Sequence, residues 1–230
     1  KQEPVDVLSE RVTCVLGMNA NDYTLNGTNC WLVGNGPQRL LIDTGDASSS
    51  AAFVANLRDA MAQTGCAGLA AILVTHQHGD HTGGIKALRE EFGDVPVMKA
   101  SAPSEPHHRQ LRDDELVHTD GATLRCLHTP GHAADHLAFF LEEERALFSG
   151  DNVLGFGTTS VQDMQAYMTG LHRFRSMAPT RIFPGHGPPV LSPESAMTLL
   201  DRYISHRTAR IEQVVELLQG QREPATAQDI

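Results

Sequence analysis

Short apolar runs alternate with amphipathic stretches along this chain. The runs are rich in Val, Ile and Leu, as buried strands are, and the stretches between them repeat apolar residues at helical spacing. Strands that alternate with helices indicate an α/β protein. We place strands at residues 11–16, 29–34, 39–43, 70–75, 95–99, 122–128, 136–141, 145–149 and 181–184.

Four segments have the periodicity of helices. We expect helices at about residues 49–63, 84–92, 160–177 and 193–219. Gly65 follows the first of them and suits the left-handed turn that ends many helices. Each segment is long enough to cover part of a sheet.

The starts of the third and fourth helices carry capping signals. Ser160 followed by Asp163 has the spacing of a capping pair. Ser192 before a proline predicts the start of the last helix, whose apolar stripe continues to Leu218. The segment 100–114 is rich in proline, serine and charge and lacks periodicity, so we expect a mobile loop there.

The length of 230 residues suits one main domain, which we place at residues 1–220. The final stretch, residues 221–230, is expected to be the start of a further, truncated segment. No run approaches the roughly 18 apolar residues that span a bilayer, which argues against a membrane role.

Charge and cysteine content narrow the function classes. Eighteen basic and 28 acidic side chains give a formal net charge of −10, which disfavours polyanionic partners unless basic residues cluster locally. The four cysteines form no CxxC pair, so we expect buried thiols rather than a disulfide framework or a zinc ribbon. We therefore expect a soluble, intracellular protein of the cytoplasm or mitochondrial matrix.

The strongest chemical signal is the sequence THQHGDH, from Thr75 to His81. It follows the apolar run AAILV, so three histidines and an aspartate lie in the loop that leaves a strand. Imidazole nitrogens and carboxylate oxygens are ligands that zinc and similar ions accept. Histidine and aspartate also cap helices and turns, but this pattern is expected by chance in only roughly two chains in a thousand of this composition.

Three further segments have a similar arrangement of strand, tight turn and ligand-type side chain. They are TPGH, which ends at His132, FSGD, which ends at Asp151, and FPGH, which ends at His186. In each, a glycine before the ligand residue allows the backbone to turn sharply.

These motifs, together with IDTG at residues 42–45, resemble those of the metallo-beta-lactamase superfamily. All five occur in the superfamily's order, and the resemblance covers nearly the whole chain. It implies a four-layer αβ/βα sandwich, in which two sheets pack face to face with helices outside and metal ions at one edge.

The resemblance also implies two metal ions, zinc first, with manganese or iron as alternatives. It assigns His76, His78 and His132 to the first ion, Asp80, His81 and His186 to the second, and Asp151 as a bridge between them. Two close cations lower the pKa of a shared water and so supply a bridging hydroxide for hydrolysis. Asp80 is then the candidate to accept or shuttle a proton.

Two other residues are candidates for supporting roles. The family places Asp43, in IDTG, beneath the site, where it helps to orient the ligands; the alternative is that it only caps a turn. His136 lies four residues after His132 and opens a strand, so it can brace the site by a hydrogen bond. No substrate-binding residue is assigned.

Within this superfamily the sequence most resembles the branch of beta-lactamase-like protein 2, whose members are endoribonucleases that act on single-stranded RNA. The segments YTLNGTNCWLVG, TPGHAADH, FSGDNVLGFGTT and YISHR carry it. Fungal relatives release polyketides from acyl carriers, so a small ester or thioester substrate is the alternative. Three further functions rank after these two: a mono-iron persulfide dioxygenase, a true beta-lactamase and a non-catalytic binding module. The oligomeric state is left open.

The remaining histidines lack a second ligand at useful spacing. His107, His108, His118, His128 and His172 are therefore expected to be structural or exposed. The last helix has a basic face, formed by Arg202, His206, Arg207 and Arg210, which is either solvated or contacts substrate phosphates or a carrier group.

Overall fold

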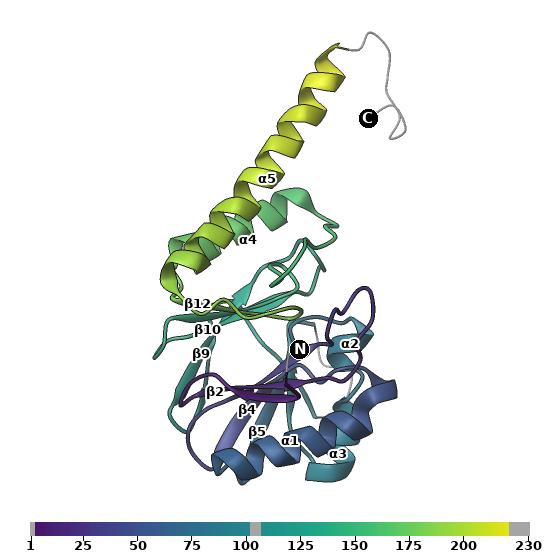
Figure 1. The fold of residues 1–230 in the computed structure, drawn as a ribbon, viewed down its shortest axis with the longest axis vertical. Coiled ribbons are helices and arrows are strands. Elements are labelled where there is room, and N and C mark those ends of the chain that lie inside the picture. The colour runs from purple at the N-terminus through teal and green to yellow at the C-terminus, as the bar shows by residue number, and fades with distance from the viewer. Residues whose placement is uncertain (1–2, 102–106, 221–230) are drawn as a thin grey trace.

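A computed structural model describes residues 3–101 and 107–220. Within these residues the chain forms two β-sheets with helices on their outer faces (Figure 1). The helices are η1 (Ala47–Ser49), α1 (Ser50–Thr64), α2 (Gly79–Thr82), α3 (Ile85–Phe92), α4 (Met164–Ser176) and α5 (Pro193–Gly220).

The first sheet has the strand order β1-β2-β3-β4-β5-β6-β7. Its strands are β1 (Val5–Val7), β2 (Val12–Leu16), β3 (Asn29–Val33), β4 (Gln38–Ile42), β5 (Gly68–Leu73), β6 (Val97–Lys99) and β7 (His108–Gln110). β1 to β4 pair antiparallel, and β4 to β7 pair parallel. Apolar side chains of α1 and α3, such as Phe53 and Leu88, cover its outer face.

The second sheet has the strand order β12-β11-β10-β9-β8. Its strands are β8 (Leu116–Thr119), β9 (Ala122–His128), β10 (Leu137–Leu141), β11 (Ala146–Gly150) and β12 (Arg181–Pro184). Tyr167 and Phe174 of α4 and Leu200 of α5 pack on its outer face.

The two sheets pack face to face over an aromatic centre. Trp31 of β3 lies with its ring centroid 5.8 Å from that of Phe148 and 4.9 Å from that of Phe183. All three side chains are buried. Central strands such as β3 and β10 are buried along their whole length, because they face the other sheet on one side and helices on the other. The predicted four-layer αβ/βα sandwich is therefore confirmed.

The nine predicted strands are all present, but the described residues also form three strands that were not expected, β1, β7 and β8. β1 and β7 are three-residue strands at the edges of the first sheet, too short to show a periodicity. β7 lies inside the segment 100–114, so the prediction of a loop there is wrong for residues 108–110. Residues 102–106 and the expected C-terminal segment 221–230 lie outside the described residues.

α4 begins later than predicted. Asp163, not Ser160, caps it, and its carboxylate accepts from the backbone N–H of Ala166 at 3.0 Å. The N–H groups of Gln162 and Asp163 donate to the carbonyl of Gly131, which holds the chain extended up to Asp163. Ser160 is therefore outside the helix, and its carbonyl has another partner described below.

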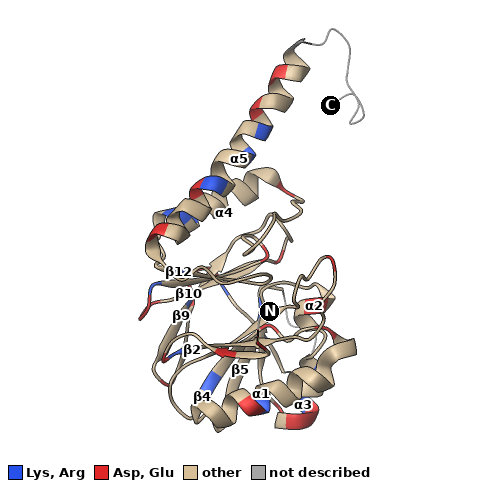
Figure 2. Ribbon diagram, in the orientation of Figure 1, with Lys and Arg blue, Asp and Glu red and all other residues tan. Residues whose placement is uncertain are grey.

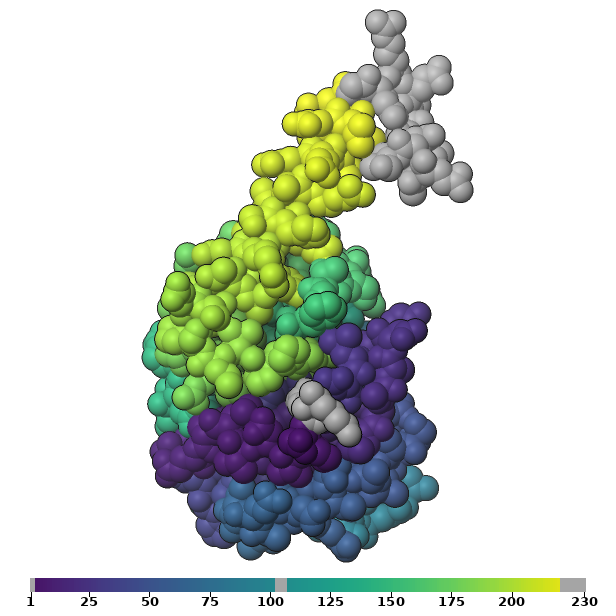
Figure 3. Space-filling model, viewed as in Figure 1, coloured from purple at the N-terminus to yellow at the C-terminus, as the bar shows by residue number. Residues whose placement is uncertain are grey.

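α5 begins at Pro193 as predicted, with the Ser192 hydroxyl accepting from Ser195 N–H at 3.2 Å. Its first half packs on the second sheet, and its second half extends away from the body (Figure 3). Val215 and Leu218 are therefore exposed, so the apolar stripe is only partly used for packing. Among the described residues, no helix is both long and apolar enough to cross a bilayer.

Candidate metal centre

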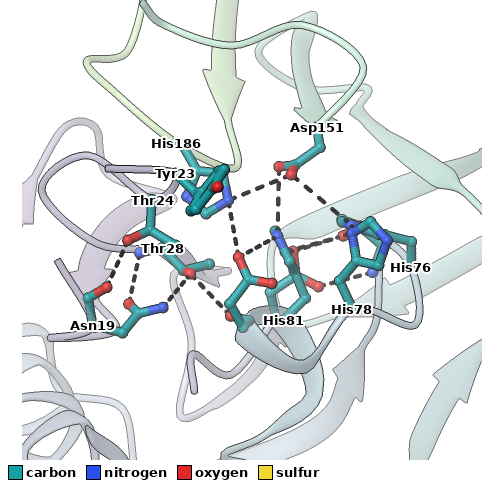
Figure 4. A network of polar contacts seen from close by, with 12 residues as sticks. Asn19, Tyr23, Thr24, Thr28, His76, His78, His81, Asp151 and His186 are labelled. Atoms are coloured by element: carbon teal, nitrogen blue, oxygen red, sulfur yellow. Dashed lines mark hydrogen bonds and ion pairs between the residues drawn. The ribbon is translucent and has the colours of Figure 1, made fainter. Parts of the chain in front are cut away.

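The seven predicted ligand residues converge at one edge of the sandwich. His76 and His78 lie in the loop after β5, and Asp80 and His81 belong to α2, the single helical turn that follows. The remaining three, which follow β9, β11 and β12, are His132, Asp151 and His186. Because these strands end at the same edge of the sandwich, their turns present side chains to a common point. Figure 4 shows five of the residues directed toward one another.

Four residues form a first group of potential ligands, His76, His78, His132 and Asp151. The Nδ1 atom of His78 lies 2.8 Å from Nε2 of His76 and 3.2 Å from Nε2 of His132. Asp151 Oδ2 lies 3.7 Å from Nε2 of His132 and 4.0 Å from Nε2 of His76. Three imidazoles and one carboxylate oxygen thus enclose one point.

A second group is formed by Asp80, His81 and His186. Asp80 Oδ2 lies 3.1 Å from Nε2 of His186 and 3.3 Å from Nε2 of His81. Asp151 faces this group too, with Oδ1 3.5 Å from His81 Nε2 and Oδ2 3.4 Å from His186 Nε2. Asp151 is therefore the one carboxylate that borders both groups.

These separations fit the donor set of a metal ion. Ligand atoms at about 2.0–2.2 Å from a tetrahedral zinc ion lie about 3.3–3.6 Å from one another. Most of the distances above are within a few tenths of an ångström of this range. Imidazole and carboxylate ligands suit zinc, manganese and iron alike, so the geometry does not choose between them.

Two buried atoms in the centre provide a test that does not depend on distances. His81 Nε2 and Asp151 Oδ1 are buried, and neither has a hydrogen-bond partner among the described residues. A buried polar atom without a partner is costly. Both atoms point into the cluster, where a cation would satisfy them, so the residues present fit a metal ion.

The electrostatics of the cluster favour positive charge at its centre. Burial raises the pKa of the Asp151 carboxyl, but the neighbouring His81 and His186 outweigh burial and hold that pKa well below its usual value. Burial lowers the pKa of His81, yet the carboxylates of Asp151 and Asp43 raise it well above its usual value. The carboxylates thus create a negative field that attracts a metal cation equally well.

Asp43 organises two of the histidines from below. Its Oδ2 lies 2.7 Å from His81 Nδ1 and accepts a hydrogen bond from the Thr75 hydroxyl at 2.8 Å. That hydroxyl oxygen is 3.0 Å from His76 Nδ1, whose N–H can donate to it. With Nδ1 protonated in both rings, the Nε2 lone pairs of His76 and His81 face the centre. Asp43 thus does more than cap a turn.

His132 is oriented from the other side of the centre. Its Nδ1 lies 2.9 Å from the Ser160 carbonyl, to which it donates, and 2.8 Å from the Thr159 hydroxyl. Its Nε2 is therefore directed at the ion position. This contact uses the Ser160 carbonyl, which takes no part in the helix because the cap of α4 is Asp163, three residues later.

His136 lies directly behind Asp151. It is fully buried, and its Nε2 accepts from the Asp151 backbone N–H at 3.2 Å. Burial lowers its pKa to about 3, so the ring is neutral. His136 thus contacts the backbone of Asp151, and its bracing role remains a prediction.

The glycines of the three turns have two different functions. Gly131 and Gly150 have φ of 148° and 49°, backbone conformations that favour glycine. Gly185, before His186, lacks a positive φ, but a Cβ there would lie 2.2 Å from Asp151 Oδ1. Position 185 therefore has no room for a side chain, because the Asp151 carboxylate packs against the Gly185 backbone.

Two residues that were not predicted from the sequence, Asn29 and Thr28, hold the turns that carry His186 and Asp80. Asn29 donates through Nδ2 to the carbonyls of Pro184 and Gly187 at 3.0 and 2.8 Å, which fixes the turn that carries His186. The Thr28 hydroxyl donates to the Asp80 carbonyl at 2.9 Å. Both lie in the NGTN sequence, which leads into the buried β3 and supplies its first residue, and this polar run at the start of an apolar strand was the available signal.

The remaining histidines are outside both ligand groups. His118, His128 and His172 are exposed, and His107 and His108 are half-buried at the other end of β6 and β7. The expectation that they have no metal role agrees with their positions. The four cysteines are buried as thiols, as predicted.

Comparison with known proteins gives consistent matches. The sequence profile of the metallo-beta-lactamase superfamily matches residues 23–214. The beta-lactamase-like protein 2 homolog of Caenorhabditis elegans is 38% identical over 234 aligned residues, which cover 99% of this chain and 77% of the relative. An atrochrysone carboxyl ACP thioesterase of Aspergillus fumigatus is 38% identical over 228 residues, or 98% of this chain and 70% of the relative.

A solved structure supports the fold independently. A beta-lactamase domain protein from Burkholderia ambifaria superimposes with a TM-score of 0.78 over 98% of this chain and 82% of its own. Its sequence identity is 23%, so the likeness concerns the fold alone.

Proposed function

Because the chain belongs to the metallo-beta-lactamase superfamily, whose members are generally metal-dependent hydrolases, we propose that it is a hydrolase with two metal ions. The proposed ligands are His76, His78 and His132 for one ion, Asp80, His81 and His186 for the other, and Asp151 for both. Zinc is the first candidate, with manganese and iron as alternatives.

The position of Asp151 is the observation that carries this proposal. Its carboxylate borders both groups at 3.4–4.0 Å, and its Oδ1 has no hydrogen-bond partner among the described residues. Asp43, Ser160 and His136 each fix a ligand residue through a hydrogen bond. Such support is typical of metal sites, whose ligands need fixed orientations.

When bound, the ions would supply an activated water near neutral pH and stabilise negative charge on the attacked oxygen. The residues of the chain have to bind them, neutralise part of their charge and handle the proton. Asp80 has the more exposed carboxylate of the cluster, at 26% of its side-chain surface against 11% for Asp151. We propose that Asp80 takes the proton that leaves the attacking water and that substrate approaches from its side.

For the substrate we propose an acyl thioester. A net charge of −10 disfavours a long polyanion. Two exposed apolar side chains suit an acyl group. Phe156 follows Gly155, whose N–H donates to the His186 carbonyl, and Met18 follows Gly17, whose N–H donates to the carbonyl of Thr28. The relative from A. fumigatus is named as a thioesterase that acts on an acyl carrier.

Single-stranded RNA is the second candidate, and it was the first choice from the sequence. The resemblance to beta-lactamase-like protein 2 in the NGTN and YISHR segments favours it, and the similar relative from C. elegans spans 99% of this chain. Tyr23, exposed over 89% of its surface, offers a ring on which a base can stack.

A substrate panel separates these possibilities. Zinc- and manganese-loaded protein is incubated with acyl thioesters, end-labelled single-stranded RNA and a cephalosporin. Thioester cleavage that is lost in Asp151→Ala, but retained in the exposed α5 control Glu212→Gln, is the expected result. Cleavage of RNA alone, lost in the same variant, would replace the thioester proposal by the nuclease one. A cephalosporinase would indicate a true beta-lactamase.

Metal analysis of the same protein addresses the other classes. About one iron per chain, with persulfide oxidised and no thioester cleaved, would indicate a persulfide dioxygenase and overturn the hydrolase proposal. A protein that binds no metal and cleaves no substrate would instead be a binding module.

A further inference from the structure

A cavity lies between α5 and residues 157–158, in the segment that leads to α4. We call it the α5 pocket. Its volume is about 240 Å³, and it is lined by Gly157, Thr158, Arg202, Tyr203, His206 and Arg207. The proposed reaction uses none of these side chains.

The lining of the α5 pocket is basic. Two arginines and a histidine line it, and no carboxylate is among its described lining residues, although the chain as a whole is strongly acidic. Arg202 and His206 are four positions apart on α5 and therefore lie on one face of the helix. Within the described chain neither side chain has an ion-pair partner, and Asp201, beside Arg202, is paired with Arg175. Figure 2 shows acidic residues toward both ends of α5 and basic residues between them, so the basic lining is local.

The wall of the pocket is fixed by hydrogen bonds. Arg207 donates to the Thr158 hydroxyl and to the Thr159 carbonyl, each at 2.7 Å, and its guanidinium lies 5.6 Å from the ring centroid of Tyr167. The Tyr203 hydroxyl donates to the Gly157 carbonyl at 3.1 Å. Arg207 and Tyr203 are therefore held in place, and the exposed side chains of Arg202 and His206 line the pocket beside them.

The wall of the pocket also touches the metal centre. The Thr159 hydroxyl lies 2.8 Å from Nδ1 of His132, and Gly155 N–H donates to the His186 carbonyl at 2.9 Å. One segment thus contacts a residue of each proposed ligand group and the α5 pocket. A molecule in the pocket would therefore lie against a segment that contacts both ligand groups.

We propose that the α5 pocket binds the phosphate of a phosphopantetheine arm that carries the thioester. This inference rests on the proposed thioesterase function. Arginine binds phosphate through paired, charge-assisted hydrogen bonds, and the pocket is large enough for one phosphate group. Such a phosphate is separated from the thioester by a flexible chain, so that one end can occupy the pocket while the carbonyl reaches the ions. Arg202 and His206 supply the free donors, and Arg207 holds the wall.

The kinetic test compares two thioesters that differ only in the phosphate, acyl-pantetheine and acyl-4′-phosphopantetheine. The wild-type protein is expected to prefer the phosphorylated substrate about tenfold or more in kcat/KM, through KM. Arg202→Ala and His206→Ala should remove the preference, so that kcat/KM for acyl-4′-phosphopantetheine falls to about the value for acyl-pantetheine. Arg210→Ala, one turn further along α5 and outside the pocket, is the matched control. Equal kcat/KM for the two substrates in the wild type would overturn the proposal.

A binding test keeps this inference separate from the catalytic one. Calorimetry with 4′-phosphopantetheine itself, inorganic phosphate and a short single-stranded RNA needs no turnover. Binding of 4′-phosphopantetheine that weakens about tenfold in Arg202→Ala, but not in Arg210→Ala, supports the site even if no thioester is cleaved, in which case only the proposed function fails. Arg202-dependent binding of RNA without binding of 4′-phosphopantetheine would overturn the site and favour the nuclease.

Discussion

The carboxylate of Asp43 lies 2.7 Å from Nδ1 of His81, at the base of the candidate metal centre. Both side chains are buried, and the same carboxylate accepts hydrogen bonds from the backbone N–H and the hydroxyl of Thr75. This contact fixes which nitrogen of His81 carries the proton. The IDTG motif therefore contributes to the centre without supplying a ligand.

Replacement of Asp43 by asparagine is expected to weaken metal binding. The amide lacks the charge that holds Nδ1–H of His81, and supporting groups of this kind typically change metal affinity 10–100-fold. Asparagine tolerates the φ of 62° at this position, so the turn itself should survive. The measurement is a competition titration against a chelator.

Asp46→Asn is the matched control, because Asp46 is a half-buried carboxylate three residues away that caps η1 and contacts none of the histidines of the centre in the described structure. Equal metal affinity in Asp43→Asn and wild type would show that this contact does not support the centre.

Gly185→Ala is expected to damage the centre without unfolding the protein. The added Cβ would lie 2.2 Å from Asp151 Oδ1 and 3.1 Å from a carbon of the His81 ring, so the carboxylate has to move. We expect metal affinity and hydrolysis to fall at least tenfold. Gly79→Ala, in the HQHGDH motif but with nothing within 4 Å of the new Cβ, should bind metal normally. Two variants with equal metal content would contradict the proposed packing.

His136 predicts a specific pH dependence of stability. Its pKa is about 3 in the folded protein, below the usual 6.5, so the unfolded chain takes up a proton that the folded chain does not. The contribution of His136 to the free energy of unfolding is complete above about pH 6.5. It is lost as the pH falls toward 3, with a slope of up to about 1.4 kcal/mol per pH unit. Denaturant unfolding of wild type and His136→Gln, both with chelator, should therefore show the shallower slope in the variant between pH 4 and 6. Parallel curves would refute a neutral, buried His136.

The cysteines are expected to be unreactive in the native protein. Burial raises the pKa of Cys30 and of Cys66, and it raises that of Cys126 to about 12, so little thiolate forms near pH 8. A thiol reagent such as DTNB should label native protein slowly and all four cysteines after denaturation. Rapid labelling of the folded protein, with its structure intact by circular dichroism, would contradict the buried positions.

The metal-centre residues could be predicted because each follows an apolar strand within a short motif. Strand ends meet at one edge of a sandwich, so residues distant in sequence, such as His81 and His186, were expected to meet. Their supporting partners were harder to find. Asn29 and Arg207 act through backbone carbonyls, and such contacts leave no spacing pattern in a sequence.

Three errors in the predicted elements have physical causes. Ser160 and Asp163 both match a helix cap, and the bonds from Gln162 and Asp163 to Gly131 decide for the later residue. β8 was missed because its four residues, LVHT, contain only two apolar positions and do not alternate, although Asp120-Gly121 between β8 and β9 is a strong hairpin signal. The short edge strands β1 and β7 form through pairing with their neighbours, which local sequence does not reveal.

We propose that seven side chains hold two metal ions that share Asp151. Anomalous diffraction from crystals of the metal-loaded protein is the direct test. We expect two peaks per chain, one among His76, His78 and His132 and one among Asp80, His81 and His186, both adjacent to Asp151. A single peak, or peaks remote from Asp151, would contradict it.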